Sequence, residues 1–247
     1  MLEHLRVGGR GEVAVVLTAA AVGSSFTGLL LPRLLGASIP ALAGLVLLAR
    51  DGRAAEATAA DAHESVDPAR KLFDVNATGP AQPADVARAF EFGVLATAAQ
   101  LVGAGQAMLD MSVEYAKQRS QFGRIIGSYQ AIKHKLADLL VDLEHARSTA
   151  YHAAWALTDA SDDPALAASI AQATCSAAFS RIAADTIQIH GGIGFTWEHQ
   201  AHLYFKRAAT DAALLGSAEQ HRDLVAAMVL DTATADGAVR VADGLPV

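Results

Sequence analysis

Apolar side chains recur at helical spacing through most of the chain that follows residue 82. Residues 84–118 contain no proline, and their larger apolar residues are spaced at near-heptad intervals: Phe90, Val94, Leu101 and Met108. The proline at position 83 suits a first helical turn, because its fixed φ matches the helix and its missing N–H is not needed there. The pattern predicts one long helix across this segment.

Three further segments predict helices. In the first, apolar residues follow the i, i+4, i+7, i+8, i+11 rule: Ile132, Leu136, Leu139, Leu140 and Leu143. Residues 164–189 open with Asp-Asp-Pro-Ala, which is typical of a helix cap and first turn, and residues 217–230 form the last segment. Long helices joined by short turns predict a mainly α fold, with an up-and-down four-helix bundle over residues 82–232 and a tail over 233–247.

The first 81 residues have a different pattern. Two apolar runs, 13–32 and 34–49, predict a reduced N-terminal helical region over residues 1–50. Residues 51–81 predict a linker and the remnant of a β domain. Within them, "RDGRAAEATAADAHE" is either a solvated helix or a linker, and Lys71–Val75 is a short strand between turns.

The first apolar run also permits a membrane-anchored bundle, since residues 13–32 carry no charge and are about long enough to span a bilayer. Four hydroxyl residues dilute the run, namely Thr18, Ser24, Ser25 and Thr27. We therefore expect residues 13–49 to form buried helices or a surface that faces a partner, and we expect no membrane association.

Composition narrows the function classes. The chain has 247 residues, of which 52% are hydrophobic and 18% charged, with a net charge of −7 and a pI near 5.7. Nucleic-acid binding is not expected, because phosphate neutralisation requires clustered Lys and Arg. The single cysteine, Cys175, has no ligand or disulfide partner at a suitable spacing and reads as a buried apolar residue. No secretory signal pattern opens the sequence, so a cytoplasmic location is expected.

Two motifs in the helical part carry a family resemblance. They are "RSQFGRIIGSYQAIKHKLAD" (119–138) and "QIHGGIGFTWEHQAHLYFKRA" (188–208). Together and in this order they resemble the C-terminal helical domain of the acyl-CoA dehydrogenases, over roughly residues 84–230. Members of that family are FAD-dependent enzymes that remove two hydrogens alpha and beta to a thioester, so the resemblance implies FAD as cofactor.

The resemblance assigns both motifs to FAD. In the family, the Arg at the position of Arg119 comes from one subunit and holds the diphosphate of an FAD bound mainly to its neighbour, a role that suits a planar guanidinium. The alternative for Arg119 is a cation that satisfies a helix C-terminus. The glycine turn of the second motif brings backbone close to the nucleotide, because glycine lacks a Cβ. The remaining cofactor residues implied are Ser120, Gln121, Phe122, Tyr129, Gln130, Gln188, His190, Gly191 and Gly192.

Four residues near the second motif have side chains that bind metals: His190, Glu198, His199 and His202. Their spacing does not match a regular ligand set, and Glu198 matches a carboxylate that is common in the family without being its base. We therefore expect no metal site.

The resemblance fails at the catalytic base. The chemistry needs a carboxylate to take the alpha proton while the flavin takes the beta hydride. The two positions at which the family places this residue are occupied here by Leu215 and Gly93, neither of which accepts a proton. Val94 stands where many members have a substrate-contacting Arg. An alternative is a displaced base at Glu91 or Glu198 in an active homo-oligomer.

The front of the chain is also reduced relative to the family, whose members carry an N-terminal helical domain and a flavin-binding β-barrel. "GLVLLARDG" and "KLFDVN" resemble barrel strands, but two or three short strands cannot close a barrel. The chain thus resembles the degenerate subunit of α2β2 heterotetrameric acyl-CoA dehydrogenases, such as those of actinobacterial steroid side-chain degradation. A homologous catalytic partner would supply the base, the barrel and the thioester pocket, and a separate electron acceptor would reoxidise the flavin. A flavin-free structural or regulatory bundle is the remaining alternative.

Overall fold

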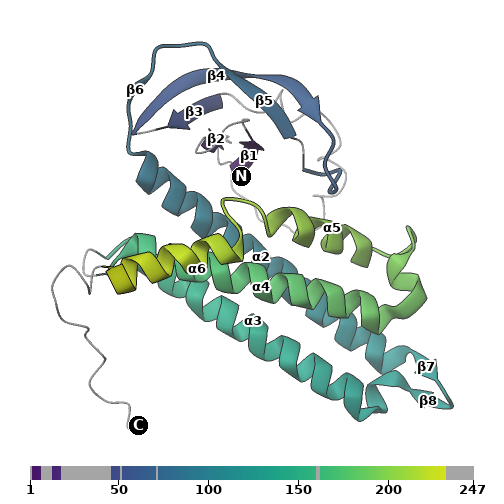
Figure 1. Ribbon diagram of the computed structural model, residues 1–247. Coiled ribbons are helices and arrows are strands. Elements are labelled where there is room, and N and C mark those ends of the chain that lie inside the picture. Colours follow the sequence, from purple (N-terminus) through teal and green to yellow (C-terminus); the bar gives the residue numbers. More distant parts are fainter. Residues whose placement is uncertain are drawn as a thin grey trace, which may run out of the picture.

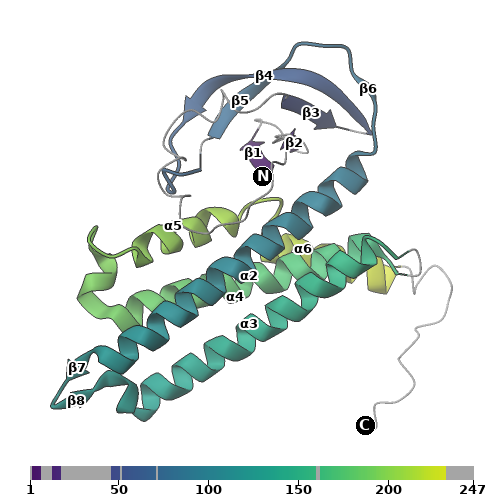
Figure 2. The ribbon, with the colours of Figure 1, turned by 180° about the vertical axis from the view of Figure 1, so that it is seen from behind.

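A sheet lies against one side of a bundle of long helices in the computed structural model (Figures 1 and 2). The structure describes residues 2–6, 13–17, 46–50, 52–70, 72–159 and 162–231. Within these ranges the fold is mainly helical, as the hydrophobic periodicity predicts. The sheet precedes the bundle in the chain and lies over the first turns of the first long helix in both views.

Three long helices build the bundle: α2 (Val86–Gln118), α3 (Gln130–Ala156) and α4 (Pro164–His190). Side-chain caps fix the start of two of them. The Asp85 carboxylate accepts a hydrogen bond from the backbone N–H of Arg88 at 2.9 Å, and the Asp163 carboxylate accepts from the first two free N–H groups of α4. Pro164 occupies the first turn of α4, as predicted from the Asp-Asp-Pro-Ala sequence.

The core lies between these three helices. Their facing sides bury large apolar residues with essentially no exposed surface: Leu101, Met108, Leu139, Leu143, Phe179 and Ile182. Many of the remaining buried positions are alanines, which lets the helix axes approach closely and explains the alanine-rich composition of this half of the chain. Since α3 buries only one of its faces, it is the outer helix of the layer.

The C-terminal part of the bundle contains one helix that the sequence pattern missed. After α4, a 3-10 turn η3 (Gly191–Phe195) leads into α5 (Ala201–Asp211), which the motif-based prediction treated only as part of a signature. The predicted helix 217–230 begins where it was expected, with a capping box at Ser217. The regular α-helix α6 (Ala218–Ala226) ends earlier than predicted. A π-helical turn η4 (Ala227–Asp231) continues it.

Among the described residues the sheet has six strands, all paired antiparallel: β1 (Leu2–Arg6), β2 (Val13–Leu17), β3 (Val46–Arg50), β4 (Arg53–His63), β5 (Leu72–Ala77) and β6 (Gln82–Pro83). Sequential strands are neighbours from β1 to β5, and β6 pairs with β4. Gly52 joins β3 to β4 with a φ of 72°, a backbone conformation that glycine adopts without strain. A register shift between Ala59 and Ala62 bends β4.

Two predictions for the first 81 residues are wrong where the structure describes them. Residues 1–50 were expected to be helical, but β1 and β2 are strands. β3 lies within residues 44–52, for which the resemblance to barrel strands predicted a strand, and that prediction is confirmed. Residues 53–63 were expected to be a helix or a linker, and they form β4, in which Ala55 and Ala57 alternate into the sheet's buried side. Short apolar runs do not distinguish a strand from a buried helix, and cross-strand packing overrides the helix propensity of alanine. The rest of 13–32 lies outside the described residues.

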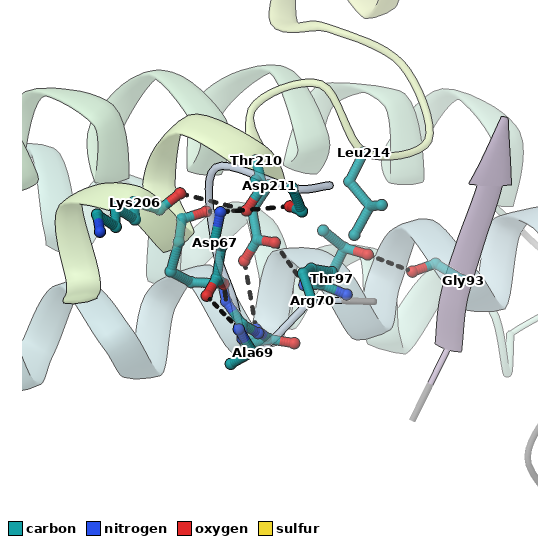
Figure 3. Close-up of polar contacts among 12 residues, drawn as sticks. Asp67, Ala69, Arg70, Gly93, Thr97, Lys206, Thr210, Asp211 and Leu214 are labelled. Carbon is teal, nitrogen blue, oxygen red and sulfur yellow. Dashed lines mark hydrogen bonds and ion pairs between the residues drawn. The ribbon is translucent and has the colours of Figure 1, made fainter. Parts of the chain in front are cut away.

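Ion pairs between buried or partly buried side chains connect the sheet to the bundle. The turn between β4 and β5 carries Asp67 and Arg70, which form ion pairs with Arg207 and Asp211 of α5 (Figure 3). The amide of Gln100 on α2 also donates to Asp211, at 3.3 Å. The Arg70 and Asp211 side chains are only 5% and 0% exposed, so this contact places two full charges in the protein interior. We refer to Asp67, Arg70, Arg207 and Asp211 as the charge cluster.

Among the described residues, α2 has the length and apolar composition that could cross a bilayer. Half of its most apolar window is buried inside the protein, and it forms the central contacts with α3 and α4. Such burial is typical of the core helix of a bundle, so its apolar character is explained by packing.

Candidate functional site

The two sequence motifs meet at one end of the bundle. Helices α2 and α4 pack against each other and run in the same direction, and α3 runs in the opposite direction, so the C-terminal ends of α2 and α4 lie together (Figures 1 and 2). The first motif leaves α2 as a small hairpin of β7 (Ser120–Gln121) and β8 (Arg124–Ile125), and the second leaves α4 as η3. We call this end of the bundle the motif end.

The hairpin presents an aromatic tip. Phe122 and Gly123 form its turn with positive φ values of 53° and 80°, and the Phe122 side chain is 91% exposed. Below the turn, the Tyr129 hydroxyl donates to the backbone carbonyl of Gln121 at 3.1 Å, and the Arg124 guanidinium stacks over the Tyr129 ring at 3.9 Å. Tyr129 therefore supports the hairpin that displays Phe122.

Arg119 ends α2 and is exposed at the base of the hairpin. Its backbone has turned to an extended conformation, its N–H donates to the carbonyl of Tyr115 at 2.9 Å, and its own carbonyl accepts from Ile126. Among the described residues no carboxylate pairs with its guanidinium. Ser120, Gln121 and Gln130 are also exposed, and the Gln130 amide contacts the His134 ring at 2.7 Å. The hairpin thus offers an exposed cation beside exposed polar and aromatic groups.

A short helical turn, η2 (Ile126–Ser128), ties the hairpin to α2 at Gly127. A Cβ built on Gly127 would lie 2.8 Å from the Ala116 carbonyl oxygen, closer than real contacts allow. Changing Gly127 to Ala must therefore push the hairpin away from α2, and we expect it to lower the free energy of unfolding by about 1–3 kcal/mol. The measurement is urea unfolding of the full chain followed by circular dichroism.

Gly103→Ala is the matched control. Gly103 lies inside α2, and a Cβ there meets nothing within 4 Å. Because alanine is the better helix former, this variant should raise the free energy of unfolding by about 0.5–1 kcal/mol. If the two substitutions change the free energy of unfolding equally, the close approach of Gly127 to α2 is contradicted.

The glycine turn of the second motif caps α4. The Gly191 N–H donates to the carbonyls of Gln188 and Ile187, and its φ of 62° redirects the chain into η3. The side chain of Gln188 and both Gly191 and Gly192 are exposed at the motif end. His190, which the resemblance also assigned to the cofactor, is instead buried directly beneath this turn.

No group of three metal-binding side chains gathers in the described part of the chain. His190 and His199 lie ring against ring, with centroids 4.5 Å apart, whereas Glu198 is exposed on the following turn. His202 contacts the edge of the Trp197 ring. These side chains make aromatic contacts here, and their arrangement does not converge on one point.

The two base positions lie at the other end of α2. Leu215 packs with Val94, the neighbour of Gly93, and with Ala168 in one buried apolar cluster that Phe90 borders. The resemblance placed these positions by counting along two separate motifs, and the fold brings them together. Neither Leu215 nor Gly93 has a side chain that can accept a proton, and Leu215 packs against apolar neighbours at this position.

The turn at Leu215 keeps an uncommon backbone. Leu215 has a φ of 59°, which non-glycine residues rarely adopt. Two buried side chains hold this turn: the Gln172 amide donates to the Leu214 carbonyl at 3.0 Å, and the His221 ring nitrogen Nε2 donates to the Leu215 carbonyl at 2.9 Å. Burial lowers the pKa of His221, and the hydrogen bond to the Leu215 carbonyl opposes that shift.

Sequence reasoning missed the buried carboxylate of Asp211, which lies four residues before Leu215 in the chain. Burial raises the pKa of Asp211, and the guanidinium groups of Arg70 and Arg207 oppose that rise. Asp211 is already engaged by Arg70 and Gln100, as Figure 3 shows for the arginine. The proposed displaced base Glu91 is ion-paired with Arg88 at 3.4 Å, and Arg88 in turn donates to the carbonyl of Leu157.

The motif end and the base positions are far apart within one chain. Gly93 and Arg119 lie on the same helix, α2, and are separated by about 39 Å at 1.5 Å per residue. The helix runs without a break between them. A single reaction centre in this chain therefore cannot use Arg119 and the Gly93 and Leu215 positions at close range.

The residues of the motif end fit FAD. A dinucleotide with a diphosphate and aromatic rings needs cations, exposed aromatic surface and backbone that can approach closely. Arg119 supplies the exposed guanidinium, Phe122 the aromatic face, and the Gly191–Gly192 turn the bare backbone. These groups come from two elements that the bundle holds at one end.

A family comparison decides the membership of the chain. The sequence profile of "Acyl-CoA dehydrogenase, C-terminal domain" matches residues 84–230, more than half of the chain. The chain belongs to the acyl-CoA dehydrogenase family. The resemblance drawn from the two motifs is thereby confirmed, together with the helical fold that it implied, and members of this family bind FAD.

Curated relatives agree with this membership. "Acyl-CoA dehydrogenase IpdE2" of Mycobacterium tuberculosis is 42% identical over 180 residues, which cover 71% of this chain and 54% of the relative. "Acyl-CoA dehydrogenase FadE34" of the same organism is 44% identical over 120 residues, which cover 48% of this chain and 17% of the relative. The chain thus spans about half the length of the first of these relatives. It spans a much smaller part of the second.

Solved structures share the fold. The structure named "Tcur3481-Tcur3483 steroid ACAD G363A variant" superimposes with a TM-score of 0.70 at 19% identity, over 94% of this chain and 63% of that chain. Butyryl-CoA dehydrogenase from Megasphaera elsdenii gives a TM-score of 0.64 at 24% identity, over 75% of this chain and 51% of that chain. The described sheet therefore belongs to the shared fold, since the first superposition extends well beyond residues 84–230.

Proposed function

We propose that this chain is a non-catalytic subunit of a heteromeric, FAD-dependent acyl-CoA dehydrogenase. It lends its motif end to a flavin held mainly by a homologous catalytic partner in an α2β2 assembly. The observation that carries the proposal is that Leu215 and Gly93 occupy the two base positions of the family, with Leu215 packed against Val94 and Ala168.

The separation of the two ends supports the same assignment. The motif end has an exposed guanidinium and other groups that fit FAD, whereas the base positions lie about 39 Å away along α2. A chain built in this way serves a reaction centre whose base comes from another chain. The steroid acyl-CoA dehydrogenase with the same fold is named by two designations, Tcur3481 and Tcur3483. Its name supports a two-chain assembly and a steroid thioester as the substrate class.

In the proposed complex the chemistry is divided. FAD would supply the acceptor for the beta hydride, and a carboxylate of the partner would take the alpha proton. Arg119 would hold the diphosphate by charge-assisted hydrogen bonds, and Phe122 would shield part of the cofactor from water. The Gly191–Gly192 turn offers backbone at close range to the nucleotide. Reoxidation would need a separate electron acceptor, and we expect the complex to be cytoplasmic.

The test is the flavin content of the co-expressed complex. We expect co-expression with a homologous acyl-CoA dehydrogenase to yield a 2:2 assembly with half a flavin per chain, measured from the absorbance ratio of the purified complex. This complex should oxidise an acyl-CoA thioester, and changing the partner's base should abolish that activity. One flavin per chain, or activity of this chain purified alone, would contradict the proposal and favour an active homo-oligomer.

A further inference from the structure

An aromatic stack joins the two motifs at the motif end. The ring of Tyr115, on the last turn of α2, stacks on the imidazole of His190, with centroids 4.4 Å apart and planes inclined by 27°. The Tyr115 hydroxyl lies 3.4 Å from the backbone carbonyl of His190, and the Tyr115 carbonyl accepts from the Arg119 N–H. His190 directly precedes Gly191, so this one contact connects the arginine hairpin with the glycine turn.

One hydrogen bond of His190 shows that its Nδ1 carries a hydrogen. Its Nδ1 lies 2.8 Å from the carbonyl oxygen of Thr186, and a carbonyl only accepts, so Nδ1 carries the hydrogen. The other nitrogen, Nε2, is buried and has no hydrogen-bond partner among the described residues. His190 is only 3% exposed, so its side chain supports the glycine turn from below and does not form its surface.

Protonation of His190 would disrupt this packing. It would place a second N–H, with positive charge, at a buried position that offers no acceptor among the residues described. Burial lowers the pKa of His190 and the nearby His199 lowers it further, whereas the hydrogen bond to Thr186 opposes the change. The titratable groups that face it are Tyr115 from α2 and His199 from the turn after η3. On its own helix, Asp185 is ion-paired with Lys135 of α3.

We propose that His190 and Tyr115 are positioning residues that hold the Arg119 hairpin and the Gly191–Gly192 turn in one fixed relation for a shared flavin dinucleotide. This inference rests on the proposed function and adds two residues that act through others. His190 supports the turn from below through its stack on Tyr115 and its place directly before Gly191, while Tyr115 links that backbone to the end of α2. Neither side chain needs to touch the cofactor.

The inference gives FAD binding a specific pH dependence. Above the lowered pKa of His190 the ring is neutral and the stack is intact, so FAD affinity is constant. As the pH falls through that pKa, protonation opposes the geometry that binds FAD, and the affinity weakens by up to about tenfold per pH unit. An imidazole that served only the stability of the bundle would not produce this change in the FAD affinity of the folded complex.

The experiment is an FAD titration of the co-purified complex between about pH 4 and pH 7.5, followed by flavin fluorescence. The range extends well below the ordinary histidine pKa because burial lowers the pKa of His190. His190→Phe keeps an aromatic ring but cannot titrate, so its FAD dissociation constant should stay within about threefold of wild type at the upper pH and lose the acid slope. His190→Asn keeps a donor for Thr186 but removes the stack, and should weaken FAD about tenfold at every pH. His152→Asn, at an exposed histidine of α3 that pairs with Asp162, should behave like wild type.

Each outcome decides between the alternatives. An acid slope that persists in His190→Phe, or FAD dissociation constants unaffected by both His190 variants, would overturn the inference even if their thermal stability fell. The same holds if His152→Asn removes the slope. A wild-type complex that binds no FAD at any pH would overturn the proposed function itself, and with it the positioning role, and is recognised by the absence of flavin before any variant is compared.

Discussion

Replacing Arg119 with Ala should raise the dissociation constant for FAD of the co-purified complex about 10- to 100-fold, because a hydrogen bond to a charged group contributes about 1.5–3 kcal/mol. Arg119 is exposed at the end of α2 and pairs with no carboxylate among the described residues, so its removal should leave the bundle folded. Equilibrium titration with FAD, followed by flavin fluorescence, measures the effect.

Two companion variants sharpen this test. Lys117→Ala removes the same charge two residues earlier, from a side chain that is already paired with Glu114 at 2.6 Å, and should change FAD affinity less than about threefold. Arg119→Lys keeps the charge but loses the planar fork, and should fall between wild type and alanine. If Arg119→Ala binds FAD as wild type does, Arg119 is only a cation at a helix C-terminus and the flavin-free alternative gains support.

Replacing Arg70 with Ala should lower the free energy of unfolding by about 3–5 kcal/mol, because it leaves the carboxylate of Asp211 buried without its main charge partner. Asp211 is 0% exposed, and of its contacts with Arg70 and Gln100 only the amide contact would remain. Denaturant unfolding of the full chain gives the value. Arg181→Ala is the control, since its pairs with Asp138 and Asp142 lie at the surface and should contribute about 0–1 kcal/mol.

The pH dependence and a double variant separate charge from packing. Without Arg70 the pKa of Asp211 should rise further, because burial raises it and Arg70 is the stronger of the two guanidinium groups that oppose that rise. The decrease in the free energy of unfolding caused by Arg70→Ala should therefore be largest at neutral pH. It should become smaller as the pH falls and Asp211 takes up a proton. The double variant Arg70→Met with Asp211→Leu should recover most of the lost stability. A loss that is the same at all pH values would show that packing, not charge, dominates at Arg70.

The sequence predicts most of the bundle because its signals are local. Helical spacing and the Asp-Asp-Pro-Ala start placed α4 at 164–189, against the observed Pro164–His190. The predicted helix at residues 84–118 is likewise confirmed as α2. Local signals fail for β4, whose alanines and acidic residues favour a helix in isolation. Pairing with β3 and β5 on either side makes it a strand.

For the candidate site too, the sequence predicts some features and leaves others to the structure. The two motifs name the residues of the motif end, but they do not reveal that His190 lies beneath the glycine turn and not on its surface. The contact between Arg70 and Asp211 joins residues 141 positions apart, and no periodicity or spacing indicates such a pair. The clustering of Leu215 with Val94 depends in the same way on how α4 and the turn after α5 pack against α2.

The unbroken length of α2 has a genetic consequence under the proposed function. Each copy of this chain contributes its hairpin to one flavin only, since its own base positions lie about 39 Å away at the opposite end of the helix. An assembly that contains one normal copy and one Arg119→Ala copy should therefore retain one working centre. Such an allele should reduce activity in proportion to its dosage. It should not inactivate the reaction centres that contain only normal copies.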